Sequence, residues 1–411
     1  MSETRDERLA RRISDLYATD QQFAHARPSE AVAQAIEATE LSLPQIVQTV
    51  LDGYADRPAL GQRAVRFVTD PSTGRTSADL LPRFDTITYG ELSARVSKVA
   101  AALNQNPVQP GDRVAILGFT SIDYTTVDMA LLHMGAVSVP LQTSAPVTQL
   151  RPIAAETEPV VIASNVDFLN DAVELALTGH LPERLLVFDY HSEVDDHRAA
   201  LEAATARLAE TPVVVETLVD VLARGTALPA TPAFDSGDDT TLALLIYTSG
   251  STGAPKGAMY PRKLVMGSWR RSSMAMWGNK GATPSITLNF MPMSHMMGRG
   301  ILYATLGAGG TGYFVARSDL STFLEDLALV RPTQLSFVPR IWDMVFGEFQ
   351  SEVDRRCADG ADRWAVETDV LADLRQSLLG GRFVSAMTGS APISAEMKTS
   401  VESLLDLHLM R

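Results

Sequence analysis

The residues best suited to chemistry form one short polar run, which begins directly after the apolar stretch Leu242–Tyr247. The run contains four hydroxyl side chains, three glycines and one lysine. Glycines let backbone N–H groups turn toward an anion, hydroxyl groups add hydrogen-bond donors, and lysine adds a positive charge. We therefore expect a loop that binds a polyphosphate, with a flexible Gly/Ser linker as the plainer alternative. The residues expected to bind the phosphates are Thr248, Ser249, Gly250, Ser251, Thr252, Gly253 and Lys256.

The spacing of this run excludes a Walker A loop. That loop needs a lysine followed by serine or threonine at the start of a helix. Lys256 instead follows Pro255 and precedes Gly257.

A second glycine-rich segment, Gly307–Gly312, has the spacing of a dinucleotide-binding loop. Dinucleotide binding requires that such a loop lead from a strand into a helix. Here an expected helix, Ile301–Leu306, comes first and an expected strand, Tyr313–Ala316, comes second. We therefore reject nicotinamide binding at this segment and expect tight packing between the helix and the strand.

His295 lies among methionines, between the apolar stretch Ile286–Phe290 and an expected helix start. Taken alone, a single histidine in such a setting is more often a packed core residue than a catalytic one. Gly389 and Ser390 follow another apolar stretch, Phe383–Met387, and precede a helix start at Ser394. Open sheets bind ligands at the carboxyl ends of strands, so these small residues indicate a binding position, with a plain strand-to-helix turn as the alternative.

Other reactive side chains have simpler interpretations. His191 and His197 stand in a wholly polar segment, for which we expect a solvated loop and not a metal site. Cys357 has no histidine near it in the sequence, so a cysteine nucleophile has no support. Four cations after the glycine-rich run are expected on an exposed helix face: Arg262, Lys263, Arg270 and Arg271.

Composition limits the class of protein. The chain has 411 residues, 45% of them hydrophobic, and a net charge of −14, which is the wrong sign for a protein that binds nucleic acid over an extended surface. A single cysteine favours a reducing compartment. We find neither an export signal nor a run of about 18 apolar residues, so we expect a cytoplasmic protein without a membrane span.

The elements that must position these residues follow an α/β pattern. Residues 1–57 are expected to form a helical extension, and residues 58–240 a first α/β part with apolar strands of a few residues between amphipathic stretches. The polar segment Thr226–Thr240 is the expected seam. Residues 241–411 are expected to form a second α/β part that carries the phosphate loop.

These segments resemble a known superfamily. Tyr247–Gly257 (YTSGSTGAPKG) resembles the phosphate-binding signature of adenylate-forming enzymes, which include acyl-CoA ligases and adenylation domains. The resemblance runs from about Asp6 to about Leu407 and is strongest to the adenylation domain of carboxylic acid reductases. Five further segments carry it: Gly118–Tyr124, Pro140–Ile153, Asn289–His295, Phe337–Phe346 and Gly389–Met397. It implies layered α/β subdomains of the adenylate-forming N-terminal core, with the C-terminal lid missing.

The resemblance also implies a reaction. A substrate carboxylate would attack the α-phosphorus of ATP, with Mg²⁺ as cofactor, to give an acyl adenylate and pyrophosphate. In similar enzymes the residue matching His295 lies beside the α-phosphate and carboxylate and donates a hydrogen bond. Lys256 and the neighbouring hydroxyls would hold the β- and γ-phosphates, and Gly389 and Ser390 would form a wall of the adenine and acyl pocket. We assign no metal ligand among the residues of this chain.

Intact carboxylic acid reductases add a phosphopantetheine thiol that takes the acyl group and NADPH that reduces it, and this sequence contains neither module. The family's next motif, whose acid binds Mg²⁺, is expected just after His408, and the lid lysine is also missing. We therefore expect a fragment truncated before the end of the core, with weak or no activity. Two alternatives stay open, a fatty acyl-CoA ligase and a non-catalytic nucleotide-binding remnant.

Overall fold

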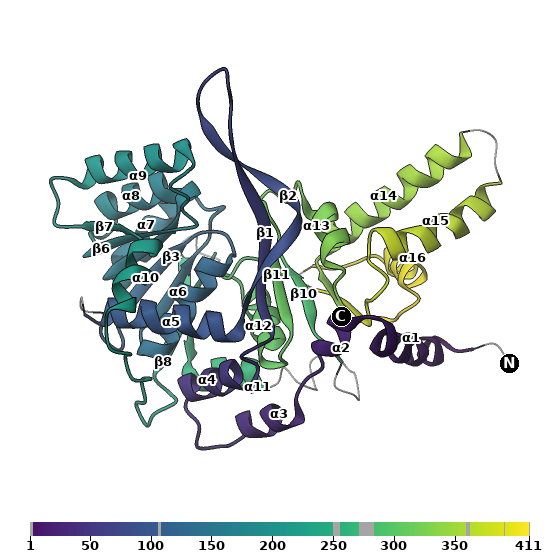
Figure 1. The fold of residues 1–411 in the computed structure, drawn as a ribbon, viewed down its shortest axis with the longest axis horizontal. Coiled ribbons are helices and arrows are strands. Elements are labelled where there is room, and N and C mark those ends of the chain that lie inside the picture. Colours follow the sequence, from purple (N-terminus) through teal and green to yellow (C-terminus); the bar gives the residue numbers. More distant parts are fainter. Residues whose placement is uncertain are drawn as a thin grey trace.

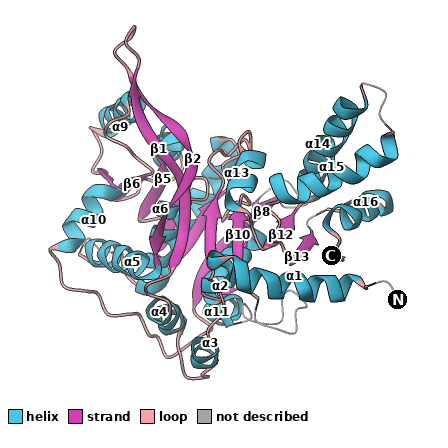
Figure 2. Ribbon diagram, turned by 45° about the vertical axis from the view of Figure 1, so that its right-hand side comes forward, coloured by secondary structure: helices cyan, strands magenta, loops and turns pink. Residues whose placement is uncertain are grey.

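The protein is described from a computed structural model that covers residues 3–105, 108–249, 255–270, 283–358, 362–389 and 391–410. These residues form layered α/β lobes on either side of a long two-stranded arm (Figure 1). The described residues contain three sheets, with helices packed on their faces (Figure 2). The expected layered α/β fold is therefore confirmed.

The first lobe is built on a seven-stranded sheet with the strand order β7-β6-β5-β3-β4-β8-β9. All neighbouring strands are parallel except β9, which runs antiparallel to β8. The strands are β3 (Arg113–Leu117), β4 (Val137–Leu141), β5 (Val161–Asn165), β6 (Arg184–Phe188), β7 (Val214–Thr217), β8 (Leu242–Ser249) and β9 (Pro255–Pro261). The helices of this lobe are α5 (Tyr89–Asn104), α6 (Ile122–Met134), α7 (Val147–Thr157), α8 (Leu169–Thr178), α9 (Asp195–Leu208) and α10 (Leu218–Thr226).

The central strands β3, β4, β5 and β6 are mostly apolar and buried at nearly every position because both faces of this sheet are covered. On β3, Val114 and Ile116 belong to the core shared with α5, α6 and α10, whereas Ala115 and Leu117 belong to the core shared with α7, α8 and α9. Alternate side chains of a strand point to opposite faces, so continuous apolar runs are what a two-sided core requires.

Local turn chemistry sets the ends of α6. The hydroxyl oxygen of Ser121 accepts the backbone N–H of Tyr124 at 3.0 Å, and Gly135 ends the helix with φ of 81°, a value that favours glycine. The chain then returns as β4. The strand, helix, strand order expected at this point is confirmed.

A four-stranded sheet, with the order β10-β11-β1-β2, lies between the lobes, and a three-stranded parallel sheet, β12-β13-β14, lies in the second lobe. The strands are β1 (Pro58–Thr69), β2 (Thr76–Thr88), β10 (Ile286–Asn289), β11 (Thr311–Phe314), β12 (Gln334–Phe337), β13 (Ser385–Thr388) and β14 (Leu409–Met410). The helices are α11 (Arg262–Arg270), α12 (Met296–Gly307), α13 (Phe323–Val330), α14 (Pro339–Cys357), α15 (Arg363–Ser377) and α16 (Ala395–Leu405).

The sheets do not follow the seam expected near residue 240. Strands β8 and β9 come after the seam but hydrogen-bond to the sheet of the first lobe through β4. Strand β1 comes before it but pairs with β11. The seven-stranded and the four-stranded sheet thus each contain strands from both expected parts.

The glycine-rich segment Gly307–Gly312 connects α12 to β11, as expected from its order. Gly309 adopts a φ of 71°. A Cβ atom on Gly310 would lie 1.9 Å from the carbonyl oxygen of Ser285, so only glycine allows this approach. The segment therefore serves tight packing.

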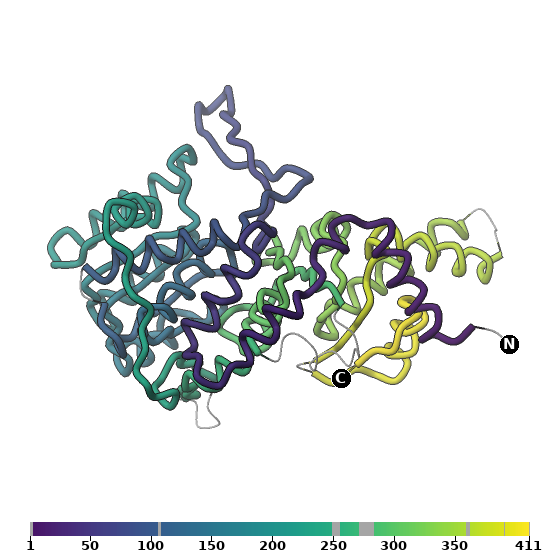
Figure 3. The backbone as a smooth tube through the Cα atoms, turned by 60° about the horizontal axis from the view of Figure 1, so that its bottom comes forward, coloured from purple at the N-terminus to yellow at the C-terminus, as the bar shows by residue number. Residues whose placement is uncertain are grey.

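The N-terminal helices form a belt along one side of the molecule: α1 (Arg5–Thr19), α2 (Gln21–His25), α3 (Glu30–Ile36) and α4 (Leu43–Gly53). Helix α1 lies against the C-terminal segment (Figure 3), where Arg8 forms an ion pair with Asp406 at 2.6 Å. Helix α4 packs instead on α5 of the first lobe. The N-terminal helices thus contact both lobes.

The prediction that Arg262 lies on an exposed face of α11 is wrong. This side chain is only 3% exposed and stacks over the ring of Phe234 at 4.7 Å, while its Nε donates to Thr241. Arg270 donates to two carbonyl oxygens at the end of α3. Only Lys263 is exposed as expected, and Arg271 lies outside the described residues.

No helix in the described parts of the chain is both long and apolar enough to cross a bilayer.

Ion pairs connect β1 of the four-stranded sheet to α13, and their contribution to stability can be tested. Arg63 on β1 pairs with Asp326 at 2.6 Å and with Glu325 at 2.8 Å; the Asp326 side chain is fully buried, whereas that of Glu325 is 54% exposed. We expect Asp326→Asn to destabilise the fold by about 3 kcal/mol, because it leaves the buried Arg63 charge poorly compensated. Glu325→Gln is the matched control and should cost less than about 1 kcal/mol. Thermal unfolding measures both, and equal shifts would contradict this account.

Candidate functional site

The expected phosphate loop lies in the sequence between β8 and β9, which pair antiparallel. Thr248 lies opposite Lys256 in the antiparallel register, both side chains are exposed, and Ser249 lies opposite Pro255. The strand before the loop is therefore confirmed, and a strand, not a helix, follows it, which agrees with the exclusion of a Walker A loop. Gly250, Ser251, Thr252 and Gly253 lie outside the described residues, as does the side chain of Ser249.

Gly257 has a packing reason within this hairpin. It lies opposite Tyr247, and a Cβ atom there would approach the ring of Tyr247 to 3.0 Å. Burial, with a contribution from Glu156, raises the pKa of Tyr247 to about 12, so its hydroxyl stays protonated at neutral pH. The glycine thus lets the ring fold over the strand that carries Lys256.

His295 is exposed and caps the N-terminus of α12, so its expected alternative as a packed core residue is wrong. Its Nδ1 atom accepts the backbone N–H of Met297 at 3.1 Å. An accepting Nδ1 means that the neutral ring carries its proton on Nε2. Nε2–H is therefore available to donate, beside the partial positive charge of a helix N-terminus.

A buried network holds the first turn of this helix. Arg299 is 1% exposed and forms an ion pair with the fully buried Asp128 of α6. Its Nε donates to the carbonyl oxygen of Met293 at 3.2 Å, in the loop just before His295. The hydroxyl of Tyr303 donates to Asp128 at 2.6 Å. The position of His295 thus depends on the contact between α12 and α6 of the first lobe.

Gly389 lies at the carboxyl end of β13 and lines a small cleft with Met297, one turn from the His295 cap. A Cβ atom on Gly389 would meet no atom within 4 Å, so its open side faces free space. The structure thus brings Gly389 to the start of α12, as a shared site requires. Ser390 lies outside the described residues.

Two polar residues at this cleft were not identified from the sequence. Ser336 at the end of β12 lines it, and Thr388 immediately precedes Gly389; both hydroxyl groups are buried without a hydrogen-bond partner among the described residues. An unpaired buried hydroxyl is unfavourable unless a ligand or water satisfies it. The only sequence signal for them is a hydroxyl residue in a strand: Ser336 lies within QLSF, and Thr388 ends SAMT.

The described residues around Gly389 therefore include a helix N-terminus capped by a donating imidazole and two unsatisfied hydroxyls, Ser336 in the cleft lining and Thr388 next to it. This set suits an anionic ligand with a flat or apolar portion. The exposed Lys256 lies on the β8–β9 strand pair, and no contact among the described residues joins it to this cleft. In the parts of the chain that the structure covers, no group of three or more His, Cys, Asp or Glu side chains is arranged to hold a metal ion.

Comparison with known proteins agrees with this interpretation. The carboxylic acid reductase of Mycobacterium tuberculosis is 65% identical over 407 residues, which is 98% of this chain and 34% of that protein. That of Segniliparus rugosus is 48% identical over 98% of this chain. A long-chain-fatty-acid–CoA ligase of Mycobacterium bovis is 27% identical over 76% of this chain.

Solved structures show the same relationship. The A domain of the Segniliparus rugosus reductase, in complex with AMP and a co-purified carboxylic acid, has a TM-score of 0.92 at 47% identity and is covered over 64% of its length. The adenylation domain of a Mycobacterium chelonae carboxylate reductase has a TM-score of 0.94 at 45% identity.

The chain spans about a third of the length of the curated reductases that it matches. The family described as AMP-binding enzyme matches residues 54–409, which is most of the sequence. This match includes the hairpin with Lys256, the His295 cap and Gly389, so the resemblance seen in the sequence is confirmed: the chain belongs to the AMP-binding enzyme family.

Proposed function

We propose that this chain carries the site that activates a carboxylic acid with ATP, forming an acyl adenylate and pyrophosphate as the first step of carboxylic acid reduction, and that as a fragment it has weak activity or none. The observation that carries the proposal is its 47% identity, over 98% of the chain, to a reductase domain whose structure holds AMP and a carboxylic acid. Fatty and aromatic acids are the proposed substrates.

The residues of the site fit the nucleotide. Gly389 leaves open space, and the buried hydroxyls of Ser336 and Thr388 lack partners that a ligand can supply. In the proposed reaction His295 Nε2–H donates to the negative charge that develops at the α-phosphate and carboxylate. Lys256 and the loop hydroxyls hold the departing phosphates.

Mg²⁺ is the cofactor proposed with ATP, and it would supply positive charge on the phosphates. We assign no residue to it, because the described side chains include no suitable cluster. Phosphopantetheine and NADPH are proposed only for the complete reductase reaction, and we assign them no residue of this chain. The single cysteine supports a reducing, cytoplasmic location.

Two other functions were open from the sequence. A fatty acyl-CoA ligase is less well supported, since the ligase relative is 27% identical where the reductase is 65% identical. The third possibility, a non-catalytic remnant that binds nucleotide, can be distinguished from an active enzyme by experiment. Pyrophosphate release with a panel of carboxylic acids supports the enzyme, whereas ATP binding without acid-dependent release supports the remnant.

Lys256→Ala is expected to weaken ATP binding about tenfold, because a charge-assisted contact to the outer phosphates is lost. Binding of AMP, which lacks those phosphates, should change by less than about twofold. Calorimetry measures both nucleotides. Lys263→Ala, an exposed lysine of α11, is the control, and an equal loss of ATP and AMP affinity in Lys256→Ala would contradict the assignment.

His295 can be tested with two substitutions that separate its roles. Asn is a good helix N-cap, so His295→Asn should keep the thermal stability, whereas His295→Ala should lose about 1 kcal/mol. Both remove the Nε2–H donor, so each should lower acid-dependent pyrophosphate release about 100-fold. If the chain releases no pyrophosphate, binding of a non-hydrolysable acyl-adenylate analogue replaces this assay. Full function in His295→Asn would show that only the cap matters.

A further inference from the structure

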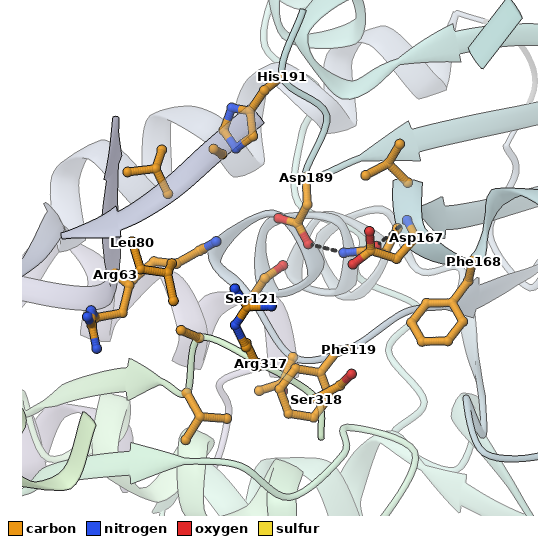
Figure 4. A pocket seen from close by; sticks show the side chains of 18 of the residues that line it. Arg63, Leu80, Phe119, Ser121, Asp167, Phe168, Asp189, His191, Arg317 and Ser318 are labelled. Carbon is orange, nitrogen blue, oxygen red and sulfur yellow. Dashed lines mark hydrogen bonds between the residues drawn. The ribbon is translucent and has the colours of Figure 1, made fainter. Parts of the chain in front are cut away.

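A second cleft of about 400 Å³ lies apart from the proposed adenylation site, between the seven-stranded sheet and the arm (Figure 4). Its floor consists of residues that directly follow β3, β5 and β6. Its facing wall comes from β1, β2 and the loop after β11. This region includes His191 and His197, for which a solvated loop is expected; both side chains are partly buried and line the cleft, and His197 lies on α9.

The topology of the sheet creates this cleft. From β3 the chain crosses through α6 to β4 on one side, and from β5 it crosses through α8 to β6 on the other side. The loops after β3 and β5 therefore diverge and leave a crevice at the carboxyl ends of the strands. Open α/β sheets bind ligands at such a switch point.

The floor carries polar groups that the protein does not satisfy by itself. Thr120 is among the residues that line the cleft and is 3% exposed, and its buried hydroxyl has no hydrogen-bond partner among the described residues. Beside it, the Nδ2 atom of Asn165 donates to the carboxyl group of Asp189 at 2.7 Å. A buried hydroxyl without a partner at the floor of a cleft indicates a missing ligand or water.

The charges around the cleft favour a cation. Asp123 behind the floor is paired with Arg95, and Arg63 on the facing wall is paired with Asp326 and Glu325. Burial lowers the pKa of His197, so that this ring stays neutral at pH 7, and His191 stacks on it. Once these groups are set aside, the carboxyl groups of Asp167, Asp189 and Asp319 remain with the guanidinium of Arg317. Asp167 and Asp319 outnumber Arg317 even while Asp189 is protonated.

The carboxyl group of Asp189 is affected first by burial and then by a neighbouring negative charge. Burial, and then the neighbouring charge of Asp123, raise the pKa of Asp189 well above its usual value. A cation in the cleft would offset the charge of Asp123 and Asp167 and allow Asp189 to ionise. Asp189 also has a φ of 52°, a left-handed conformation that Asp and Asn tolerate better than most residues.

We propose that this cleft binds an organic ammonium ion, whose charged nitrogen is held by Asp189 and Asp167 and whose apolar body lies against Phe119 and Phe168. The two rings line the same cleft and supply the apolar and cation–π surface that such a body needs. A bare metal ion fits less well, since no metal-binding cluster occurs among the described side chains. This inference does not depend on the proposed adenylation function.

The proposal predicts a pH dependence with a definite sign. Below its raised pKa, Asp189 is protonated and must lose its proton when the ammonium binds, whereas above that pKa it is already ionised. Affinity should therefore increase from about pH 6 to about pH 9, by at most tenfold per pH unit, since alkylammonium groups themselves stay charged in this range. Arg317, which extends from the facing loop toward this side in Figure 4, opposes the cation at every one of these pH values.

The test is calorimetry of the 411-residue chain with 2-phenylethylammonium chloride and with 2-phenylethanol as its neutral isostere. We expect the ammonium ion to bind at least about tenfold more tightly than the alcohol, and saturating ATP to leave its affinity unchanged. Equal affinity for the two probes, no measurable binding of the ammonium ion, or its displacement by ATP would overturn the proposal.

Three substitutions make the test specific. Asp189→Asn keeps the left-handed backbone and should remove the pH dependence. Asp167→Asn should weaken ammonium binding several-fold but keep that dependence, and Arg317→Gln should strengthen binding. The last two residues are exposed, so these variants test the proposal even if Asp189→Asn does not fold. Weaker binding in Arg317→Gln would indicate an anion site, and an unchanged pH profile in Asp189→Asn would remove Asp189 from the site; either result overturns the proposal.

Discussion

The ion pair between Arg299 and Asp128 is the constraint on which the proposed active site depends. Both side chains are buried, and an unpaired charge at either position would be strongly unfavourable. The pair is therefore accompanied by further hydrogen bonds: Tyr303 and Ser138 donate to Asp128, and Arg299 also holds the carbonyl oxygen of Met293. Asp128 belongs to α6, which packs on the seven-stranded sheet, and Arg299 belongs to α12, which His295 caps. The network therefore fixes the position of His295 relative to the seven-stranded sheet.

Long-range pairing is the general means by which this chain brings its site together. Strand β1 lies parallel to β11, with Leu60 opposite Gly312, although some 250 residues separate them in the sequence. The belt of N-terminal helices adds the ion pair between Arg8 and Asp406. Such contacts close large loops, and the entropy cost of closing them is offset by the whole core and not by local turns.

Local features of this fold could be predicted from the sequence, and partner-dependent features could not. The strand before the phosphate loop and the order of helix and strand around Gly307–Gly312 follow from periodicity and turn residues. The burial of Arg262 does not, because it depends on Phe234, which lies nearly thirty residues earlier. The same holds for His191 and His197, whose polar segment became the wall of a cleft only when the arm covered it, with Phe67 against His191. Ser336 and Thr388 were missed because a hydroxyl at the end of a strand has no signature until the neighbouring strand is known.

The two clefts follow one architectural rule but have opposite electrostatics. Both lie at the carboxyl ends of parallel strands, and both contain buried hydroxyl groups without partners. At the proposed adenylation site the N-terminus of α12 favours an anion, and Lys256 is proposed to add a positive charge, although the chain as a whole has a charge of −14. At the cleft beside the arm, the carboxyl groups around Asp189 repel one. On these two proposals, local charge favours a triphosphate at the first cleft and disfavours it at the second, so the two sites do not compete for the same ligand.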